Sequence, residues 1–234
     1  MSERTDFEHP EFLTSTDWLG EHLGEPGICV VDCDVPEQYH RAHVPGAVFQ
    51  EDHYQKDPDT NRLHILGPQG FKRFAESLGI GDETLVVAYD NSRGLYAARL
   101  WWALHHYGHT NVKVMDGGWR KWLSEGRPVT DAPAGNAPPV TFTPHKDDSM
   151  MLTAAQLMED YQKPEVVVWD VRSRGEYEGT ITRGNRRPGR IAGAVHLEWL
   201  ELVDSKTHML KPASEIRRIL QANGITPDKR IDAH

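Results

Sequence analysis

The chain has 234 residues, a length that fits one large domain or two modest ones. Its 38% apolar and 26% charged residues are typical of a globular protein and exclude collagen, coiled coil and a wholly disordered chain. The net charge of −9 opposes binding to nucleic acid phosphates, and no apolar run approaches the roughly 20 residues of a membrane span, so neither nucleic acid nor membrane is an expected partner.

Two similar halves follow each other along the chain, and each opens with the signal of a helix N-terminus. A hydroxyl residue stands three positions before a side-chain acceptor, a spacing that lets the pair satisfy the first free amides of a helix. The pairs are Thr14 with Asp17 and Thr153 with Gln156. A short helix is therefore predicted at the start of each half.

Each predicted helix is followed by a continuous apolar run, residues 28–31 in the first half and 166–169 in the second. Both runs are rich in β-branched side chains, which predicts strands buried on both faces. Further matches keep the same order in both halves: Asp32 with Asp170, Tyr39 with Tyr177, residues 46–48 with 193–195, and residues 79–80 with 224–225. Buried strands that alternate with helices predict parallel sheets.

The first half continues as a whole α/β domain. Its further predicted elements are a helix over 70–78, a strand over 85–89, a loop over 90–94, a helix over 95–104 and a strand over 112–115. Between the halves, a proline-rich stretch with little apolar periodicity indicates a linker. We predict a first domain over 1–130, a linker over 131–150 and a partial second domain over 151–234.

The chain resembles the tandem-rhodanese sulfurtransferases, the family of thiosulfate and 3-mercaptopyruvate sulfurtransferases. The resemblance rests on the repeat and on VVDCDVPEQYHRAHVPGAVF, LGIGDETLVVAYD, RLWWALHHYGHTNVKVMDGGWRKW, WDVRSRGEYEG and RIAGAVHLEW. It implies an α/β fold of two rhodanese-like domains with parallel sheets flanked by helices, the second one incomplete here. It also implies transfer of sulfur from a small anionic donor to a thiol or cyanide through a cysteine persulfide in the second domain.

The family's nucleophile sits in a loop of converging backbone amides ahead of a helix, an arrangement that stabilises a thiolate. In the first half this is the loop of Asp90 and Arg93, and a carboxylate at the nucleophile position carries no persulfide, as in the family's inactive first domain. A capping role for Asp90 at the helix near Gly94 is favoured over a catalytic one.

The second half contains no cysteine. Aligning the halves sets Ile231 opposite Leu85 and His234 opposite Ala88, so the expected catalytic cysteine lies beyond His234 and no catalytic residue is assigned. Residues 232–234, Asp-Ala-His, depart from an apolar strand pattern. A sheet without a central strand exposes an open edge, so the second half is expected to be marginal, partly open or completed by another chain, and the same edge favours self-association.

Six arginines lie within residues 172–190, a positive island that suits an anionic donor. For Arg183, Arg186 and Arg187 a solvated loop is the favoured interpretation. Arg172 follows a predicted strand, at the place of the family's substrate-binding arginine, where the first half has Asp34. A guanidinium matches an oxyanion bidentately, and a structural ion pair is an equal alternative for Arg172.

Cys29 and Cys33 are the chain's two cysteines, and on one strand they lie about 13 Å apart, too far for a disulfide. Free, buried thiols in a reducing compartment are expected, and with no secretory signal a cytoplasmic location. The 13 histidines show no metal spacing, and no nucleotide motif is present, so neither a metal nor a cofactor is expected. His105, His106 and His109 cluster near the end of a predicted helix.

Three functional hypotheses remain open. The first is a sulfurtransferase whose sequence is truncated before the nucleophile and which is inactive by itself. The second is a non-catalytic protein that binds an anion or a protein partner. The third is a decayed gene product.

Overall fold

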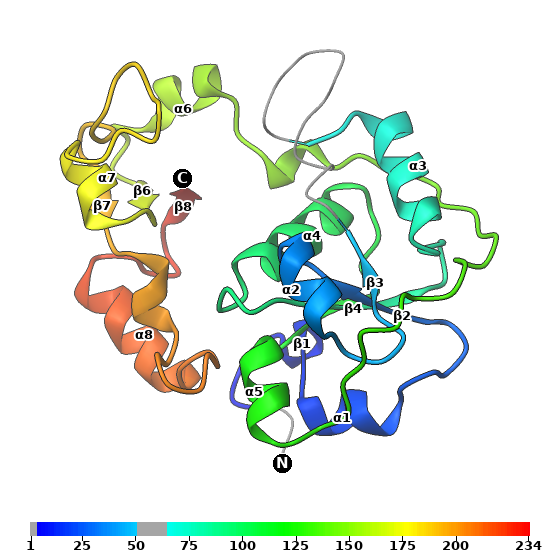
Figure 1. Cartoon of the computed structure of the whole chain (residues 1–234). Helices are drawn as coiled ribbons and strands as arrows, with labels where there is room; N and C mark the ends of the chain where they lie inside the picture. Colours follow the sequence, from blue (N-terminus) through cyan, green and yellow to red (C-terminus); the bar gives the residue numbers. More distant parts are fainter. Residues whose placement is uncertain (1–3, 51–64) are drawn as a thin grey trace. The chain divides into compact units, whose positions relative to one another are not determined.

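The computed structural model describes residues 4–50 and 65–234 and divides into two compact units. The first unit comprises Met1–Met150 with Thr207–Met209, and the second comprises Met151–Lys206 with Leu210–His234. Helices flank a sheet in each unit (Figure 1). The structure therefore has the predicted α/β class.

The first unit contains a five-stranded sheet in the order β1-β5-β4-β2-β3, with parallel pairing throughout. Its strands are β1 (Leu13–Thr14), β2 (Ile28–Asp32), β3 (Val48–Phe49), β4 (Leu85–Tyr89) and β5 (Val112–Met115). Its α-helices are α1 (Thr16–Glu21), α2 (Pro36–Arg41), α3 (Pro68–Ser77), α4 (Leu95–His106) and α5 (Gly118–Ser124).

Side chains of β2 alternate between two apolar clusters, one on each face of this sheet. Val31 packs in a cluster with Phe71 of α3 and Leu100 of α4. Val30 packs in the other cluster, which includes Trp122 of α5. Because both faces of the strand are covered, the continuous apolar run of β2 fits a central strand of a parallel sheet.

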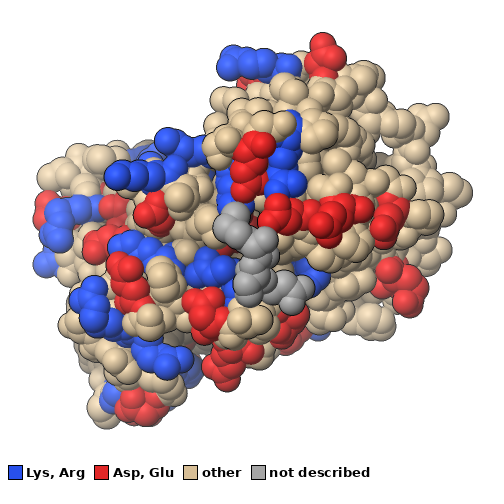
Figure 2. Space-filling model, turned by 90° about the horizontal axis from the view of Figure 1, so that it is seen from below, with Lys and Arg blue, Asp and Glu red and all other residues tan. Residues whose placement is uncertain are grey.

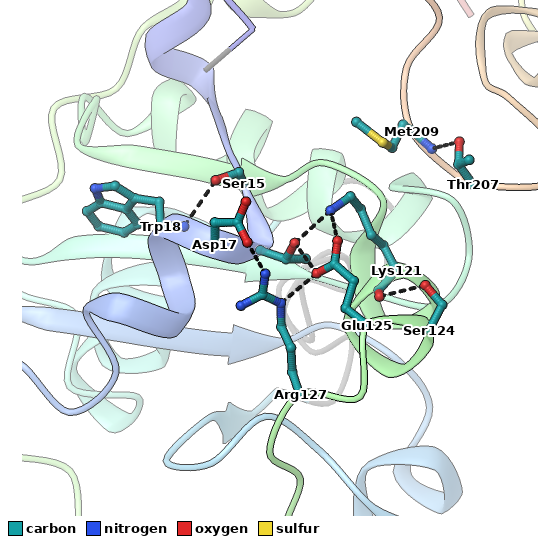
Figure 3. A network of polar contacts seen from close by, with 10 residues as sticks. Ser15, Asp17, Trp18, Lys121, Ser124, Glu125, Arg127, Thr207 and Met209 are labelled. Atoms are coloured by element: carbon teal, nitrogen blue, oxygen red, sulfur yellow. Dashed lines mark hydrogen bonds and ion pairs between the residues drawn. The ribbon is translucent and has the colours of Figure 1, made fainter. Parts of the chain in front are cut away.

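A polar network joins α1 to α5 on one side of the first unit (Figure 3). The Lys121 ammonium donates to Thr16 Oγ1 at 2.7 Å and also pairs with Glu125. Thr16 Oγ1 in turn donates to Glu125 Oε2 at 2.6 Å. Lys121 is only 8% exposed, and this pairing lets a buried ammonium remain in the fold.

The helix N-termini correct one prediction and confirm the other. At α1 the N-cap is Ser15, whose side chain accepts the Trp18 N–H, while Thr14 lies in β1; the predicted cap was one residue early. Because β1 pairs with β5, the backbone of Thr14 is held in the strand, and the hydroxyl of the next residue, Ser15, caps the helix. At α6 (Ala154–Asp160), Thr153 and Gln156 form the predicted capping box.

Residues 131–150, predicted as a linker, lie along the first unit. The Phe142 side chain is 1% exposed and belongs to the cluster of Phe71. Its backbone N–H donates to Glu76 Oε1 at 3.1 Å, and its carbonyl accepts from the Lys72 ammonium at 2.9 Å. At the end of this stretch, the Met150 carbonyl accepts from the Trp102 indole at 3.0 Å.

The second unit contains a three-stranded parallel sheet in the order β7-β6-β8. Its strands are β6 (Val166–Asp170), β7 (Val195–His196) and β8 (Arg230–Ala233). Its α-helices are α6, α7 (Arg174–Glu178) and α8 (Ala213–Ala222). Within the described residues, β8 pairs along one edge only.

The predicted repeat has a structural counterpart in both sheets. Tyr39 donates its hydroxyl to the Ala47 carbonyl at 3.0 Å, and Tyr177 donates its hydroxyl to the Ala194 carbonyl at 3.2 Å. β2 pairs with β3 as β6 pairs with β7. β4 and β8 lie at equivalent places beside β2 and β6.

This register corrects the predicted alignment by one residue. The Cys33 N–H donates to the Tyr89 carbonyl at 2.8 Å, and at the equivalent place the Val171 N–H donates to the His234 carbonyl at 3.1 Å. His234 therefore corresponds to Tyr89 and not to Ala88. The position equivalent to Asp90 is not among the 234 residues.

The expectation that residues 232–234 depart from a strand is also wrong, because Asp232 and Ala233 lie in β8. Backbone pairing with β6 sustains the strand: the Arg230 N–H donates to the Glu165 carbonyl at 2.9 Å, and the His234 N–H donates to the Trp169 carbonyl at 3.0 Å. The Asp232 carboxylate is 7% exposed and is paired with the Arg230 guanidinium, which offsets its charge.

Acidic side chains lie beside basic ones over much of the face shown in Figure 2. Within the described residues, no helix has both the length and the apolar character that crossing a bilayer requires.

Candidate functional site

The loop that follows β4 in the first unit holds the Asp90 carboxylate in a ring of backbone amides. Oδ1 accepts the N–H groups of Ser92 at 2.7 Å and Gly94 at 2.8 Å. Oδ2 accepts those of Tyr96 and Ala97, both at 2.9 Å. Tyr96 and Ala97 lie in the first turn of α4, so Asp90 accepts two of the free amides of that helix, as predicted for a capping residue.

Two features of the backbone allow the loop to curl around this carboxylate. Arg93 adopts a φ of 63° and Gly94 a φ of 90°, which turns successive amides inward. The Asp90 carbonyl also accepts the Trp119 N–H at 2.9 Å. A Cβ on Gly118 would lie 2.2 Å from that carbonyl oxygen, so only glycine fits there.

Asp90 is 1% exposed. Burial raises its pKa above the ordinary value, and the four amide donors act in the opposite direction. Amide donors need an acceptor, which the ionised carboxylate supplies. The first-unit loop is thus an anion-binding nest already occupied by a side chain of the protein.

A second buried carboxylate, Asp32, lies at the end of β2. It accepts the Tyr89 hydroxyl at 2.7 Å and the Asp34 N–H at 2.9 Å. Burial raises the pKa of Asp32 to about 6. The Asp34 carboxylate reaches the neighbouring loop and accepts the Asn91 N–H at 3.0 Å. The two loops at this edge of the sheet are therefore connected through carboxylates.

In the second unit, Arg172 is bound to a carboxylate at the end of β6. Its Nε donates to Asp170 Oδ1 at 2.9 Å, and its Nη2 donates to Asp170 Oδ2 at 2.6 Å. Nη2 also donates to the Gly189 carbonyl at 2.9 Å. The structural ion pair, one of the two predicted roles of Arg172, is thus present, and 25% of the arginine side chain stays exposed.

Sequence reasoning treated Asp170 only as a marker of the repeat and missed it as the partner of Arg172. An acidic residue that ends a buried strand two positions before an arginine was the available signal. Burial acts against ionisation, but the Arg172 side chain and N–H lower the pKa of Asp170 below its ordinary value.

Two histidines adjoin this pair. His196 Nε2 donates to the Arg172 carbonyl at 2.9 Å. His234 Nε2 lies 3.4 Å from Asp170 Oδ2, and burial lowers the pKa of His234. Sequence reasoning did not single out either histidine. Together these side chains fix the turn that carries Arg172.

The other arginines of the positive island lie apart from Asp170. Arg174 pairs with Glu178, and Arg183 Nε lies 3.5 Å from Glu176 Oε1. The guanidinium carbon of Arg190 lies 4.7 Å from the centroid of the Tyr177 ring. Arg186 and Arg187 are exposed. This arrangement matches the solvated loop favoured for Arg183, Arg186 and Arg187.

Both cysteines of the chain are buried and free of disulfides, as predicted. The Cys29 thiol donates to the Leu78 carbonyl at 3.4 Å, and burial raises its pKa to about 12. Cys33 is 3% exposed. Neither lies in the amide nest of Asp90, so neither is placed to act as a thiolate nucleophile.

Metal-binding chemistry finds no support in the arrangement of side chains. Across residues 4–50 and 65–234, no group of three or more His, Cys, Asp or Glu side chains is arranged to hold an ion. The histidines at the end of α4 include His106, which is fully buried.

Residues 15–125 match the family described as the rhodanese-like domain. Over 96% of this chain and 82% of the relative, the sequence is 34% identical to the sulfur carrier protein TtuD of Thermus thermophilus. The chain belongs to the rhodanese family of sulfurtransferases. It is also 32% identical to a thiosulfate sulfurtransferase of Cricetulus griseus, over 94% of this chain and 77% of that protein.

The same family includes 3-mercaptopyruvate sulfurtransferases. The chain is 31% identical to that of Rattus norvegicus, over 94% of this chain and 80% of the relative. A 3-mercaptopyruvate sulfotransferase of Escherichia coli has a similar solved structure, with a TM-score of 0.84, 24% identity and coverage of 95% of this chain and 87% of that one. That likeness shows a rhodanese fold.

Proposed function

We propose that this rhodanese-family chain serves transfer of sulfane sulfur from thiosulfate or 3-mercaptopyruvate to a thiophilic acceptor. The relatives named as thiosulfate and 3-mercaptopyruvate sulfurtransferases support this choice of donors. The relative named as a sulfur carrier supports a covalently held sulfur atom.

In the proposed reaction with thiosulfate, a cysteine thiolate attacks the outer sulfur. The sulfur–sulfur bond of thiosulfate breaks, sulfite leaves with the bonding electron pair, and a cysteine persulfide anion remains. Cyanide then attacks the terminal sulfur of the persulfide. The persulfide bond breaks, thiocyanate leaves and the thiolate is restored, so no outside oxidant or reductant is consumed.

The observation that carries the assignment of roles is the Asp90 carboxylate in the first-unit nest, where it accepts four backbone N–H groups. This loop has the form that stabilises a sulfur anion, but a carboxylate fills it. Cys29 and Cys33 are buried elsewhere. We therefore propose that neither is the sulfur carrier and that the 234-residue chain alone transfers no sulfur.

Arg172 is the residue we assign to the donor anion. The Asp170 carboxylate fixes the guanidinium through two hydrogen bonds, and the exposed quarter of the side chain remains open to an anion. A fixed guanidinium loses little conformational freedom when it binds an oxyanion. Binding and the structural ion pair are therefore compatible.

The test is formation of thiocyanate from thiosulfate and cyanide by the purified chain, beside a Cys29→Ala/Cys33→Ala variant. No turnover by either protein is the expected result. Turnover by the unchanged chain that the double substitution abolishes would assign the sulfur to a first-unit thiol and overturn the assignment of roles.

A non-catalytic rhodanese-like protein that binds an anion or a protein is the second candidate, favoured by the occupied nest of Asp90. The reading frame after codon 234 separates the two candidates. A cysteine codon in the loop that follows the equivalent of Tyr89 supports the enzyme, whereas a stop codon favours the binding protein. The cytoplasmic location and self-association through the free edge of β8 are further proposals, tested by cell fractionation and light scattering.

A further inference from the structure

The first unit has a pocket near the amino ends of strands β2 and β4, at the opposite end of β4 from Asp90. Its volume is about 360 Å³, and its lining includes Gly27 and Thr84, which directly precede β2 and β4. Asp90 follows the opposite end of β4. At about 3.3 Å per residue the strand separates the two places by roughly 17 Å, so the pocket is distinct from the rhodanese loop.

Glycines and apolar side chains make up most of the lining. The glycines are Gly24, Gly27, Gly46, Gly79 and Gly135. At Gly27, Gly46 and Gly135 an added Cβ would meet no atom within 4 Å, so the backbone there borders open space. Peptide groups, rather than long side chains, are therefore within reach of a ligand.

The described lining residues include no Asp, Glu, Lys, Arg or His. Their polar side chains are those of Cys29, Thr84 and Asn136: the Cys29 thiol donates to the Leu78 carbonyl, the Thr84 hydroxyl accepts the Gly81 N–H at 2.9 Å, and Asn136 carries an uncharged amide. None of the described lining side chains supplies a counter-ion, so the lining favours an uncharged ligand.

One wall is formed by part of the predicted linker, the wall segment of residues 134–140. At its start, the Ala134 N–H donates to Tyr39 Oη at 3.4 Å. Just beyond its end, the Thr141 carbonyl accepts the Asp82 N–H at 2.9 Å. Because both ends are attached to the first unit, the pocket is formed before any ligand enters.

We infer that this pocket binds a small, uncharged, mostly apolar molecule, about the size of a single ring or of two fused rings. The volume lies within the usual range for small-molecule pockets, roughly 300–1,000 Å³, and exceeds the roughly 150 Å³ of an apolar cavity that holds benzene. The glycine-rich backbone supplies hydrogen-bonding groups for one polar edge of such a ligand. The inference does not depend on sulfur transfer.

Indole is a suitable probe because it is uncharged, bicyclic and carries one N–H donor. Titration of the ¹⁵N-labelled chain with indole is expected to shift the amide signals of Gly27, Gly46 and Gly135 in a saturable way. The amides of Ser92 and Gly94, which face Asp90, are expected not to move. Absence of saturable shifts at the three glycines would overturn the inference.

A matched pair of variants tests the location. The Ala137 Cβ lies 3.4 Å from the position of a Cβ on Gly79, so Ala137→Phe fills the pocket. Ala132→Phe places the same ring on an exposed residue of the same stretch, outside the lining. Loss of indole shifts in Ala137→Phe alone, with unchanged thermal unfolding of both variants without indole, is expected; equal binding by both variants would contradict the location.

Indole-3-carboxylate tests the chemical class, because it adds a charge to a similar shape. We expect its affinity to be at least about tenfold weaker than that of indole, since no lining side chain offsets the carboxylate. Equal affinity would refute selection for uncharged ligands.

Discussion

Asp32 and Asp170 occupy the same position in the two repeats, but their carboxylates have different partners. Asp32 accepts the Tyr89 hydroxyl, whereas Asp170 accepts two donors of the Arg172 guanidinium. A neutral partner leaves burial dominant, and the pKa of Asp32 rises to about 6; the cation lowers that of Asp170. One repeated residue thus gives the two units opposite responses to pH.

Asp32→Asn is expected to alter the pH dependence of stability. A pKa raised from 3.8 to about 6 stabilises the fold below pH 3.8, and this contribution is lost as pH rises to about 6. The stability of the variant relative to the unchanged chain should therefore increase over this interval, by up to about 3 kcal/mol. Urea unfolding at several pH values measures it, and parallel pH curves for the two proteins would count against the buried carboxyl.

Arg172→Ala is expected to destabilise the second unit by about 3 kcal/mol, because it leaves the fully buried Asp170 carboxylate without its cation. Acid is also expected to destabilise this unit when it protonates Asp170: the lowered pKa contributes stability above about pH 3.8 that is lost as pH falls further.

Arg174→Ala is the matched control, because Arg174 forms an exposed pair with Glu178. Such a pair contributes about 1 kcal/mol or less. Urea unfolding of both variants gives the comparison, and equal losses would show that the Asp170 pair has no special weight.

Asp90→Ala is expected to cost the first unit about 2–4 kcal/mol, because four amide donors of the loop and of the first turn of α4 lose their acceptor. Asp131→Asn changes an exposed carboxylate of the same unit and is expected to stay within about 0.5 kcal/mol. Thermal unfolding of the two variants is the measurement. A small effect at Asp90 would mean that water replaces the carboxylate without loss.

Asp90→Cys, made together with Cys29→Ala and Cys33→Ala, tests whether the nest still stabilises a sulfur anion. The thiol pKa is expected to lie well below the value of about 12 for Cys29, because both thiols are buried but only the thiol at position 90 also receives the converging amides. The ultraviolet absorbance of the thiolate, recorded as a function of pH, measures this pKa. A pKa as high as that of Cys29 would refute the nest as a site for anionic sulfur.

The native thiols are expected to resist an anionic disulfide reagent, because Cys29 and Cys33 are buried and the pKa of Cys29 is about 12. In denaturant both should react. The coloured product released by an aromatic disulfide reagent, measured before and after urea is added, gives the number of thiols that react. Rapid reaction of a thiol in the folded chain would contradict the burial.

Local sequence patterns predicted β2, β4 and β5 because each is a short, mostly apolar run between turn residues, but they did not predict the two-residue strands β1 and β3. They failed where pairing outweighs side-chain preference: Asp232 lies in a strand because β6 aligns the backbone beside it. The cap of α1 moved to Ser15 for the same reason, since β1 engages Thr14.

The site was predictable in part. The position of Asp90 was predictable, because a capping residue directly follows a predicted strand. For Arg172 the sequence predicted two alternative roles, binding of an oxyanion or a structural ion pair. Asp170 stands two positions before Arg172, so its partnership could have been predicted from the sequence, whereas His196 and His234 reach this pair only through the fold, because β7 and β8 pair on either side of β6. No spacing along the chain records that meeting.

The burial of Phe142 affects where the first unit can be cut for separate expression. A fragment that ends at residue 130 would lack this ring, exposing Phe71 and Tyr107, which stack on each other with centroids 4.6 Å apart. A fragment that ends at Met150 would keep the ring and the anchoring bond of Trp102. The practical limit of the independently folding piece therefore lies at Met150, 26 residues beyond the end of α5 at Ser124.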